Sequence, residues 1–260
     1  MSEATDRLLA LMQRLRDPET GCEWDRAQRF ETIVPQTIEE AYEVADAVAR
    51  GDVAAIKDEL GDLLFQVVFQ ARIAEEAGLF DFGDVATGIT DKLIARHPHI
   101  FGDVVVAAQP QEARWEAIKA EERNAQGATS ALDGVALALP ALMRAEKLQK
   151  RAARQGFDWP DTAGPTDKLN EEMDELAAAT SANERAEEAG DLLFAAVNLV
   201  RAHGVSAEEA LRAANAKFER RYRAMESLAT ARGQDFAKLD LEAQEALWQA
   251  VKASEAAEST

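Results

Sequence analysis

Two groups of acidic residues with the same internal spacing recur along the 260-residue chain. Each group joins a Glu-Glu-x-x-Glu segment to a later Glu-x-x-Asp segment. Residues three apart on a helix project from one face, so two antiparallel helices would bring four carboxylates together. A cation must neutralise such a cluster, because like charges at short range repel strongly. The expected metal ligands are Glu40, Glu43, Glu59 and Asp62 in the first half, and Glu172, Glu175, Glu188 and Asp191 in the second.

The alternative for each acidic group is an ordinary solvated helix face, which is the more common explanation for one Glu-Glu-x-x-Glu segment. The recurrence of both segments in the same order favours a metal site. Gly61 and Gly190 lie between the acids of the second segments. Glycine within a helix costs about 1 kcal/mol relative to alanine. We therefore expect another helix or a ligand to approach closely at these two positions.

The ligand types favour Mg²⁺, with Mn²⁺ as a substitute, because hard cations prefer carboxylate oxygens. A di-iron helical bundle would use Glu-x-x-His pairs, but Asp62 and Asp191 stand at the histidine position. One cysteine and three histidines disfavour zinc. Carboxylate-bound Mg²⁺ with open coordination positions commonly recruits phosphates. The acidic groups therefore predict a phosphate-bearing substrate.

Lys217 and Arg221 are four residues apart and could clamp phosphate oxygens from one helix face. The alternative, that they are ordinary surface residues, is equally consistent with the sequence. Trp24, Trp159 and Trp248 are candidates for stacking on a base, although tryptophan is more often a core residue. No Walker A loop or Gly-x-Gly-x-x-Gly segment occurs, which excludes a P-loop or Rossmann nucleotide site as far as motifs can.

The elements that position these residues are predicted to be helices, because strong helix formers dominate long proline-free stretches. Only Val104–Val106 is strand-like, so we expect an all-α fold. Thr37 is expected to cap one helix and Asp52 or a neighbouring residue to open the next, and Ser206 with Glu209 forms an expected capping box. Besides an amphipathic N-terminal helix, the expected helices are 38–50, 53–77, 82–96, 112–123, 140–155, 167–179, 184–203, 206–231 and 240–257.

The two halves of the chain resemble each other. Residues 37–48 parallel 169–180, and residues 58–68 parallel 187–197. Two long copies indicate duplicated domains, since a solenoid needs three or more shorter units. We expect an N-terminal helical domain at 1–123, a linker at 124–138 and a C-terminal domain at 139–260. Further parallel pairs are Trp24 with Trp159, Lys92 with Lys217, and Arg96 with Arg221.

The composition narrows the class of protein. A net charge of −19 speaks against binding to nucleic acid or to an anionic membrane surface. A hydrophobic content of 47% is too high for an acidic disordered chain. The single cysteine, Cys22, excludes an intrachain disulfide and fits a reducing compartment. The N-terminus has no signal-peptide pattern and no segment is apolar enough to span a bilayer, so we expect a cytoplasmic protein.

Specific motifs extend over most of the chain, from about residue 8 to residue 252. They are CEWDRAQ (22–28), EEAYEV (39–44), DELGDLLFQVVFQ (58–70), RHPHIFGD (96–103), WEAIKAEER (115–123), LPALMRAEKLQKRAARQGFDWPD (139–161), EEMDEL (171–176), EEAGDLLFA (187–195) and ANAKFERRYR (214–223). In these motifs the chain resembles the MazG family of nucleoside triphosphate pyrophosphohydrolases, two-domain type.

The resemblance implies tandem all-α domains in a homodimer. It also implies Mg²⁺-dependent hydrolysis of nucleoside triphosphates to monophosphate and pyrophosphate, with broad base tolerance, a nucleotide-pool house-cleaning activity. The C-terminal domain would be the catalytic one, with the second carboxylate group as its metal ligands. The implied nucleotide contacts are Lys168, Leu169, Asn170, Glu171, Glu172, Glu184, Arg185, Ala186, Glu187, Lys217, Arg221 and Trp248. The N-terminal copy keeps its acids, but Asn215 has no counterpart there.

The expected mechanism is in-line attack of a metal-activated water on the α-phosphorus. Glu171 or Glu172 would orient or deprotonate the water. Lys217 and Arg221 would stabilise charge on the leaving group. The alternative function is a regulatory or scaffold protein that binds nucleotide without turnover. A di-iron oxidase is a third hypothesis, which the aspartates disfavour.

Overall fold

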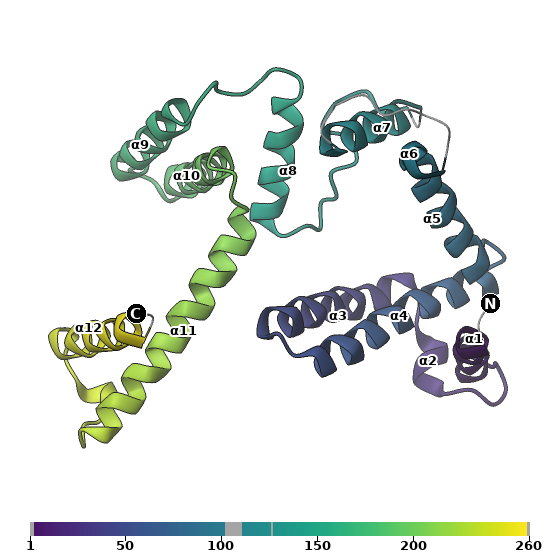
Figure 1. The fold of residues 1–260 in the computed structure, drawn as a ribbon, viewed down its shortest axis with the longest axis horizontal. Helices are drawn as coiled ribbons and strands as arrows, with labels where there is room; N and C mark the ends of the chain where they lie inside the picture. The colour runs from purple at the N-terminus through teal and green to yellow at the C-terminus, as the bar shows by residue number, and fades with distance from the viewer. Residues whose placement is uncertain (1–2, 102–110, 126, 259–260) are drawn as a thin grey trace. The chain divides into compact units, whose positions relative to one another are not determined.

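The computed structural model describes residues 3–101, 111–125 and 127–258, and every regular element in these ranges is a helix (Figure 1). The predicted all-α fold is confirmed, while Val104–Val106 lies outside the described residues. Within the described ranges, no helix has the length and apolar content that crossing a bilayer requires. The helices are α1 (Glu3–Leu15), α2 (Glu23–Ala27), α3 (Phe30–Arg50), α4 (Val53–Glu76), α5 (Phe82–Arg96), α6 (Pro98–Phe101), α7 (Gln111–Ala125), α8 (Ala141–Ala153), α9 (Ala163–Ala178), α10 (Ala182–Ala202), α11 (Ala207–Ala231), the 3₁₀-helix η1 (Phe236–Lys238) and α12 (Leu241–Glu258).

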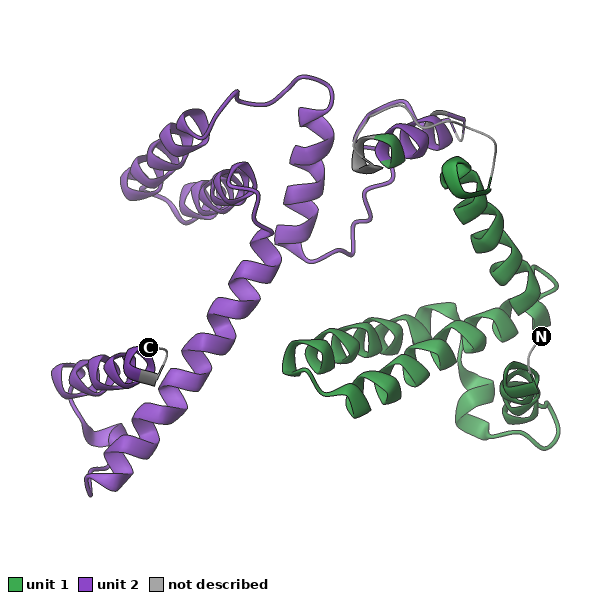
Figure 2. Cartoon of the chain, in the orientation of Figure 1, with its two compact units in different colours: residues 1–115 green, residues 116–260 purple. Residues whose placement is uncertain are grey.

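The chain divides into two compact units, residues 1–115 and residues 116–260 (Figure 2). This division falls inside α7. The limits expected from the sequence, with a linker at 124–138, stay a prediction. Each unit contains one closely packed antiparallel pair of helices, α3 with α4 in the first and α9 with α10 in the second. These pairs are the elements that carry the two acidic groups.

In unit 1 a tight turn sets the pairing of α3 and α4. Gly51 ends α3 in the left-handed conformation, with a φ of 67°. The Asp52 side chain then caps α4 by accepting from the backbone N–H groups of Ala54 and Ala55, both at 3.1 Å, as predicted. Helix α1 packs on α4 and closes the core of this unit. The core residues are Met12, Ile33, Val68, Phe69 and Ile73.

The expected cap at Thr37 is wrong, because α3 already begins at Phe30 and continues through Pro35. The Thr32 hydroxyl accepts from the Arg29 backbone N–H at 2.8 Å and so closes the true start. Thr37 lies inside the helix, where its hydroxyl donates to the Ile33 carbonyl and accepts from Gln70 Nε2 of α4 at 2.9 Å. Thr37 thus ties α3 to α4 rather than starting α3.

In unit 2, α9 begins at Ala163, earlier than expected, because Pro165 lies in the first turn. Proline is tolerated there, since first-turn N–H groups have no helical partner. Ser181 and Glu184 form a capping box at the start of α10, so this helix also begins before residue 184. At the start of α11 only half of the expected box forms, in which the Ser206 side chain accepts from the Glu209 N–H.

The other helices of unit 2 pack on α10 and on one another. Helix α8 packs against both α10 and α11, and α11 packs along α12. A small core of Met225, Ala229, Leu247 and Val251 joins α11 to α12. The α9–α10 pair and the α11–α12 pair are therefore separate packing interfaces within this unit.

Candidate metal centre

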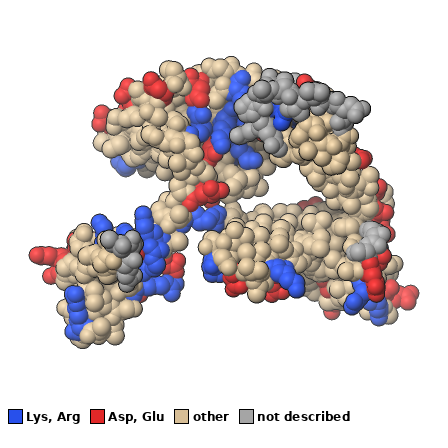
Figure 3. Space-filling model, in the orientation of Figure 1, with Lys and Arg blue, Asp and Glu red and all other residues tan. Residues whose placement is uncertain are grey.

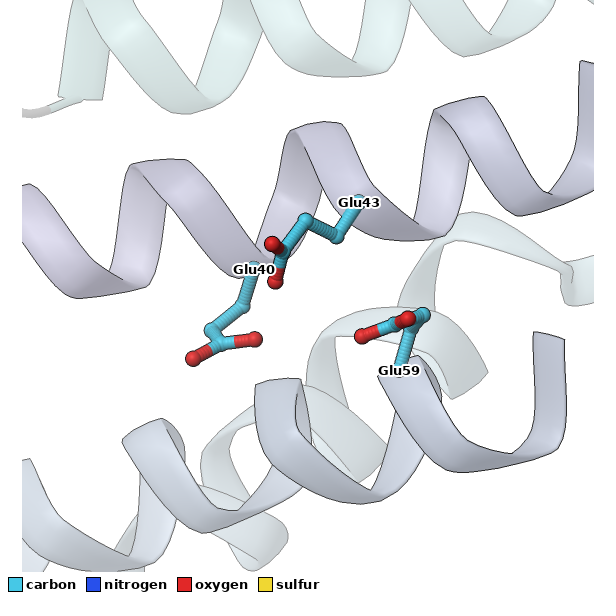
Figure 4. Close-up of side chains that lie close together, drawn as sticks. All are labelled: Glu40, Glu43 and Glu59. Carbon is cyan, nitrogen blue, oxygen red and sulfur yellow. The ribbon is translucent and has the colours of Figure 1, made fainter. Parts of the chain in front are cut away.

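In unit 1 the acidic group assembles across the α3–α4 pair. Glu40 and Glu43 project from α3 toward Glu59 on α4 (Figure 4). Each of the three offers a carboxylate oxygen within 4.8 Å of the other two. Asp62 lies outside this set, although its charge still acts on Glu40. The structure therefore brings together three of the four carboxylates that the spacing predicted.

The electrostatics of this group show the cost of uncompensated charge. Burial is the largest cause that raises the pKa of Glu40, followed by a hydrogen bond and repulsion from Glu43. Burial also raises the pKa of Glu59, with repulsion from Glu43 next. Both carboxyls are thus harder to ionise than ordinary glutamates. A bound cation would reverse this, because it stabilises the ionised form.

In unit 2 the corresponding set is Glu172 on α9 with Glu188 and Asp191 on α10, again with oxygens within 4.8 Å of one another. Glu172 is the most buried member, at 4% exposure. Its Oε2 has no hydrogen-bond partner among the described residues. Burial raises the pKa of Glu188, and repulsion from Glu175 follows as the second cause. Glu175 is exposed and lies outside the close set.

Lys168 partly offsets the negative charge of the second group. Its Nζ lies 2.8 Å from Oε1 of Glu171 and 2.7 Å from Oε1 of Glu172. The hydrogen bond to Glu171, and then that to Glu172, raise the pKa of this lysine well above its usual value. Glu171 therefore lies at the exposed rim of the group, held by Lys168, while Glu172 points inward. Of the two expected general bases, Glu172 therefore belongs to the group and Glu171 lies beside it.

The first turn of α10, which contains the predicted contacts Glu184 to Glu187, makes local capping contacts. The Glu184 carboxylate accepts from the backbone N–H groups of Thr180 and Ser181 at 2.8 and 3.0 Å. These bonds lower its pKa to about 2. Arg185 donates to the Thr180 carbonyl at 3.1 Å. A Ser-x-x-Glu pattern was present in the sequence and would have indicated this cap. A role of this turn in nucleotide binding stays a prediction.

Lys217 and Arg221 lie on α11, where basic side chains gather, as they do over α8 (Figure 3). Arg221 Nε donates to Glu255 of α12 at 2.8 Å, and its guanidinium lies 5.4 Å from the centre of the Trp248 ring. Lys217 is exposed one turn earlier. Within the described part of the chain, no ion pair joins Lys217 or Arg221 to the acids of α9 and α10. The structure thus places this predicted pair against α12. Lys92 and Arg96, their counterparts, lie on α5.

The two helical glycines contradict one expectation. A Cβ added to Gly61 or Gly190 would meet no atom within 4 Å among the described residues. In the part of the chain that the structure describes, no other helix approaches closely at either position, and that part of the prediction is wrong. The space beside each glycine remains open to a ligand or to another molecule.

The three candidate tryptophans have different surroundings. Trp24 is half exposed and lies edge-on to Phe69, with ring centres 6.5 Å apart. Trp248 packs against Phe218, with ring centres 5.7 Å apart. Trp159 lines a cavity that also reaches the second acidic group. Two polar residues of this cavity, Gln149 and Asn198, were not singled out in the sequence, because they follow no recognisable chemical spacing.

In each unit one pair of helices carries three close carboxylates, a donor set that suits a hard divalent cation in a helical fold. Two family models match the sequence. The model described as MazG nucleotide pyrophosphohydrolase domain matches residues 28–101. The model described as Phosphoribosyl-ATP pyrophosphohydrolase matches residues 139–218. The two matches cover one acidic pair of helices each.

Several relatives are similar over nearly the whole chain. A nucleoside triphosphate pyrophosphohydrolase of Escherichia coli (strain K12) is 53% identical over 96% of this chain and 97% of its own length. The nucleoside triphosphate pyrophosphohydrolase/pyrophosphatase MazG of Thermotoga maritima is 42% identical over 95% of both chains. A nucleoside triphosphate pyrophosphohydrolase of Mycobacterium tuberculosis is 38% identical over 60% of this chain and 48% of its own. The chain belongs to the MazG family of nucleoside triphosphate pyrophosphohydrolases, which confirms the enzyme class expected from the motifs.

Proposed function

We propose that this chain hydrolyses nucleoside triphosphates between the α- and β-phosphates, with Mg²⁺ or Mn²⁺ as cofactor, and releases nucleoside monophosphate and pyrophosphate. The observation that carries the proposal is the set of Glu172, Glu188 and Asp191 in unit 2. The names of the Escherichia coli and Thermotoga maritima relatives support the reaction. Broad tolerance of the base, and a role in clearing the nucleotide pool, are part of the same proposal.

The residues of unit 2 fit a hard divalent cation. All donors are carboxylate oxygens, and the buried Oε2 of Glu172 needs a partner. Glu172, Glu188 and Asp191 would hold the ion, with Glu175 completing the set from one turn along α9. When bound, the ion supplies positive charge for the phosphate oxygens and lowers the pKa of a bound water. Its charge would also relieve the repulsion that raises the pKa of Glu188.

The chain's own residues supply the remaining parts of the reaction. A water oxygen bonds to the α-phosphorus, and the bond from that phosphorus to the bridging oxygen breaks. Glu171 or Glu172 orients the water and accepts its proton. Lys168, beside both carboxylates, draws the triphosphate toward them. Lys217 and Arg221 stabilise the charge that develops on the departing pyrophosphate.

We further propose that the working form is a homodimer, in which the second copy brings its Lys217 and Arg221 to the acidic group. In its own chain Arg221 packs against α12, away from the acids. Large apolar side chains on α9, α10 and α11 are exposed in the single chain, which is typical of surfaces that another copy covers. These side chains are Met173, Leu193, Phe194, Leu211 and Phe218.

The lone cysteine, Cys22, favours a cytoplasmic location.

The proposed reaction is tested by product analysis across a panel of nucleoside triphosphates with Mg²⁺ or Mn²⁺. We expect monophosphate and pyrophosphate from each nucleotide, and no turnover in a chelator. In ¹⁸O-labelled water the label should enter the monophosphate, because the water attacks the α-phosphorus. Diphosphate with orthophosphate, or label in the pyrophosphate, would show a different cleavage. Removing the acids of each unit in turn identifies the active copy.

A further inference from the structure

The side chain of Arg221 is held in one orientation by helix α12. Its Nε donates to Oε2 of Glu255 at 2.8 Å, and its guanidinium lies 5.4 Å from the centre of the Trp248 ring. The side chain as a whole is 19% exposed. A free arginine samples many rotamers, and ordering it costs conformational entropy. The two contacts from α12 therefore fix the position of the Arg221 charge before any ligand binds.

The bond to Glu255 uses the inner nitrogen of the Arg221 guanidinium. Among the described residues, nothing accepts a hydrogen bond from its two outer nitrogens, Nη1 and Nη2. The outer nitrogens of an arginine form the fork that binds two phosphate oxygens at once. Glu255 thus holds Arg221 and leaves its phosphate-binding end available.

Glu255 is itself fixed in place. Its Oε1 accepts from Nε and Nη2 of Arg220, both at 3.2 Å. The hydrogen bond from Arg221 is the largest cause that lowers the pKa of Glu255, so the carboxylate is ionised at neutral pH. The small core that includes Met225 and Leu247 keeps α11 and α12 together. The carboxylate is therefore a fixed partner of Arg221.

The tryptophan and the glutamate of this group recur in the first half of the chain. The segment WEAIKAEE (115–122) parallels WQAVKASE (248–255), so Glu122 corresponds to Glu255. In both segments the two residues are seven apart, which places them on one face of a helix. The repeat therefore contains the tryptophan and the glutamate as well as the arginine. A chance surface ion pair does not explain this recurrence.

We propose that Glu255 is a positioning residue for the phosphate-binding Arg221. It holds the guanidinium so that the outer nitrogens are available to the pyrophosphate group, and the side chain then loses little further entropy when substrate binds. The sign of the effect is diagnostic. A negative charge near a phosphate site would by itself weaken phosphate binding. Positioning predicts the reverse, that loss of Glu255 weakens binding. This inference rests on the proposed function and deepens it.

The test measures binding of α,β-methylene adenosine triphosphate to the full chain with Mg²⁺, by calorimetric titration. The methylene bridge prevents cleavage at the proposed bond. Glu255→Ala should weaken binding by about three- to tenfold, the effect of ordering one long side chain. Glu255→Gln keeps an acceptor for Arg221 and should lose less. Glu219→Ala is the matched control, because Glu219 pairs with Arg223 at an exposed position of α11, and it should bind like the wild type.

A double-mutant cycle shows whether Glu255 acts through Arg221. Arg221→Ala should weaken binding more than Glu255→Ala does. Adding Glu255→Ala to Arg221→Ala should cause no further loss, because the arginine to be positioned is already absent. A general structural defect would lower the affinity in both backgrounds, and thermal unfolding of each variant identifies it. Turnover should show the same pattern in kcat/KM.

Equal or tighter binding by Glu255→Ala, no measurable binding of the analogue by the wild type, or a further loss in the double variant would overturn the positioning role. These outcomes are separable from the proposed reaction. A chain that shows the predicted cycle but releases diphosphate and orthophosphate contradicts the reaction alone. A chain that releases pyrophosphate with the same kcat/KM in Glu255→Ala as in the wild type contradicts the positioning role alone.

Discussion

At the scale of single residues, the most informative atom is the buried Oε2 of Glu172. It has no partner among the described residues, while Oε1 is paired with Lys168. A buried carboxylate oxygen without a partner is unfavourable, since desolvation is then uncompensated. The same acid in unit 1, Glu40, is less buried. A bound cation would therefore relieve a larger desolvation cost in the acidic group of unit 2 than in that of unit 1.

Glu172→Gln and Asp191→Asn should each reduce pyrophosphate release by about 100-fold or more, because each removes a charged donor to the metal. Binding of Mn²⁺, followed by electron paramagnetic resonance, should weaken in parallel. Asp174→Asn is the matched control, since it removes the same charge from an exposed position two residues along α9. An unchanged rate in Asp191→Asn would refute the assignment of this group.

The close contact between Gly164 and the Trp159 ring gives a second prediction for a single residue. Alanine there would place its Cβ on the Trp159 indole, so the ring must shift. We expect Gly164→Ala to lower the free energy of unfolding by about 1–3 kcal/mol, as overpacking does. Gly190→Ala meets no neighbour and should instead stabilise α10 by about 0.5–1 kcal/mol. Denaturant unfolding of both variants checks the contrast.

At the scale of elements, helix ends account for much of what the sequence could predict. Gly51, Asp52 and the stop of α5 before His97 were predicted correctly, because caps and breakers act locally. The start of α3 was missed, since Thr37 was read as a cap, whereas in the structure its hydroxyl lies inside the helix and bonds Gln70 of α4. Short sequence motifs at helix ends carry no information about such contacts between two helices.

The same distinction applies to the candidate site. The carboxylates that converge were predicted from helical spacing, because residues three apart on a helix share one face. Gln149 and Asn198 were missed, since their importance comes from what surrounds them in space. The placement of Arg221 against α12 was equally invisible, because it depends on how α11 and α12 pack.

The start of α10 yields a pH prediction. Backbone hydrogen bonds hold the pKa of Glu184 at about 2, below its usual 4.5. A lowered pKa in the folded state stabilises the fold above the unfolded-state pKa, and that stabilisation is lost as the pH falls toward 2. Glu184→Ala should therefore lower the unfolding temperature at pH 7, with the difference shrinking below about pH 4.5. Glu184→Gln, which keeps an acceptor but no charge, should show a smaller loss, which also shrinks below about pH 4.5.

At the scale of the whole molecule, the proposed homodimer can be tested by complementation. Asp191→Asn and Arg221→Ala should each be nearly inactive alone. After mixing and subunit exchange, half of the dimers carry one chain of each kind and therefore one intact site, so about a quarter of wild-type activity should return. Pyrophosphate release, with molar mass by light scattering, measures this. No recovery in a mixed dimer would place both groups of a site in one chain.

The repeat pairs Phe69 of the N-terminal copy with Asn198 of the C-terminal copy, and this difference has a thermodynamic consequence for the duplicated chain. The N-terminal copy packs the Phe69 ring into its own core, whereas Asn198 of the C-terminal copy lines a cavity of about 500 Å³ beside the acidic group. Binding raises the melting point only of the part that binds. We expect a scanning calorimetry trace in which a nucleoside monophosphate moves one transition upward and leaves the other in place. The unfolding transition of the C-terminal copy would then report nucleotide occupancy, and the transition of the N-terminal copy in the same chain would serve as the reference.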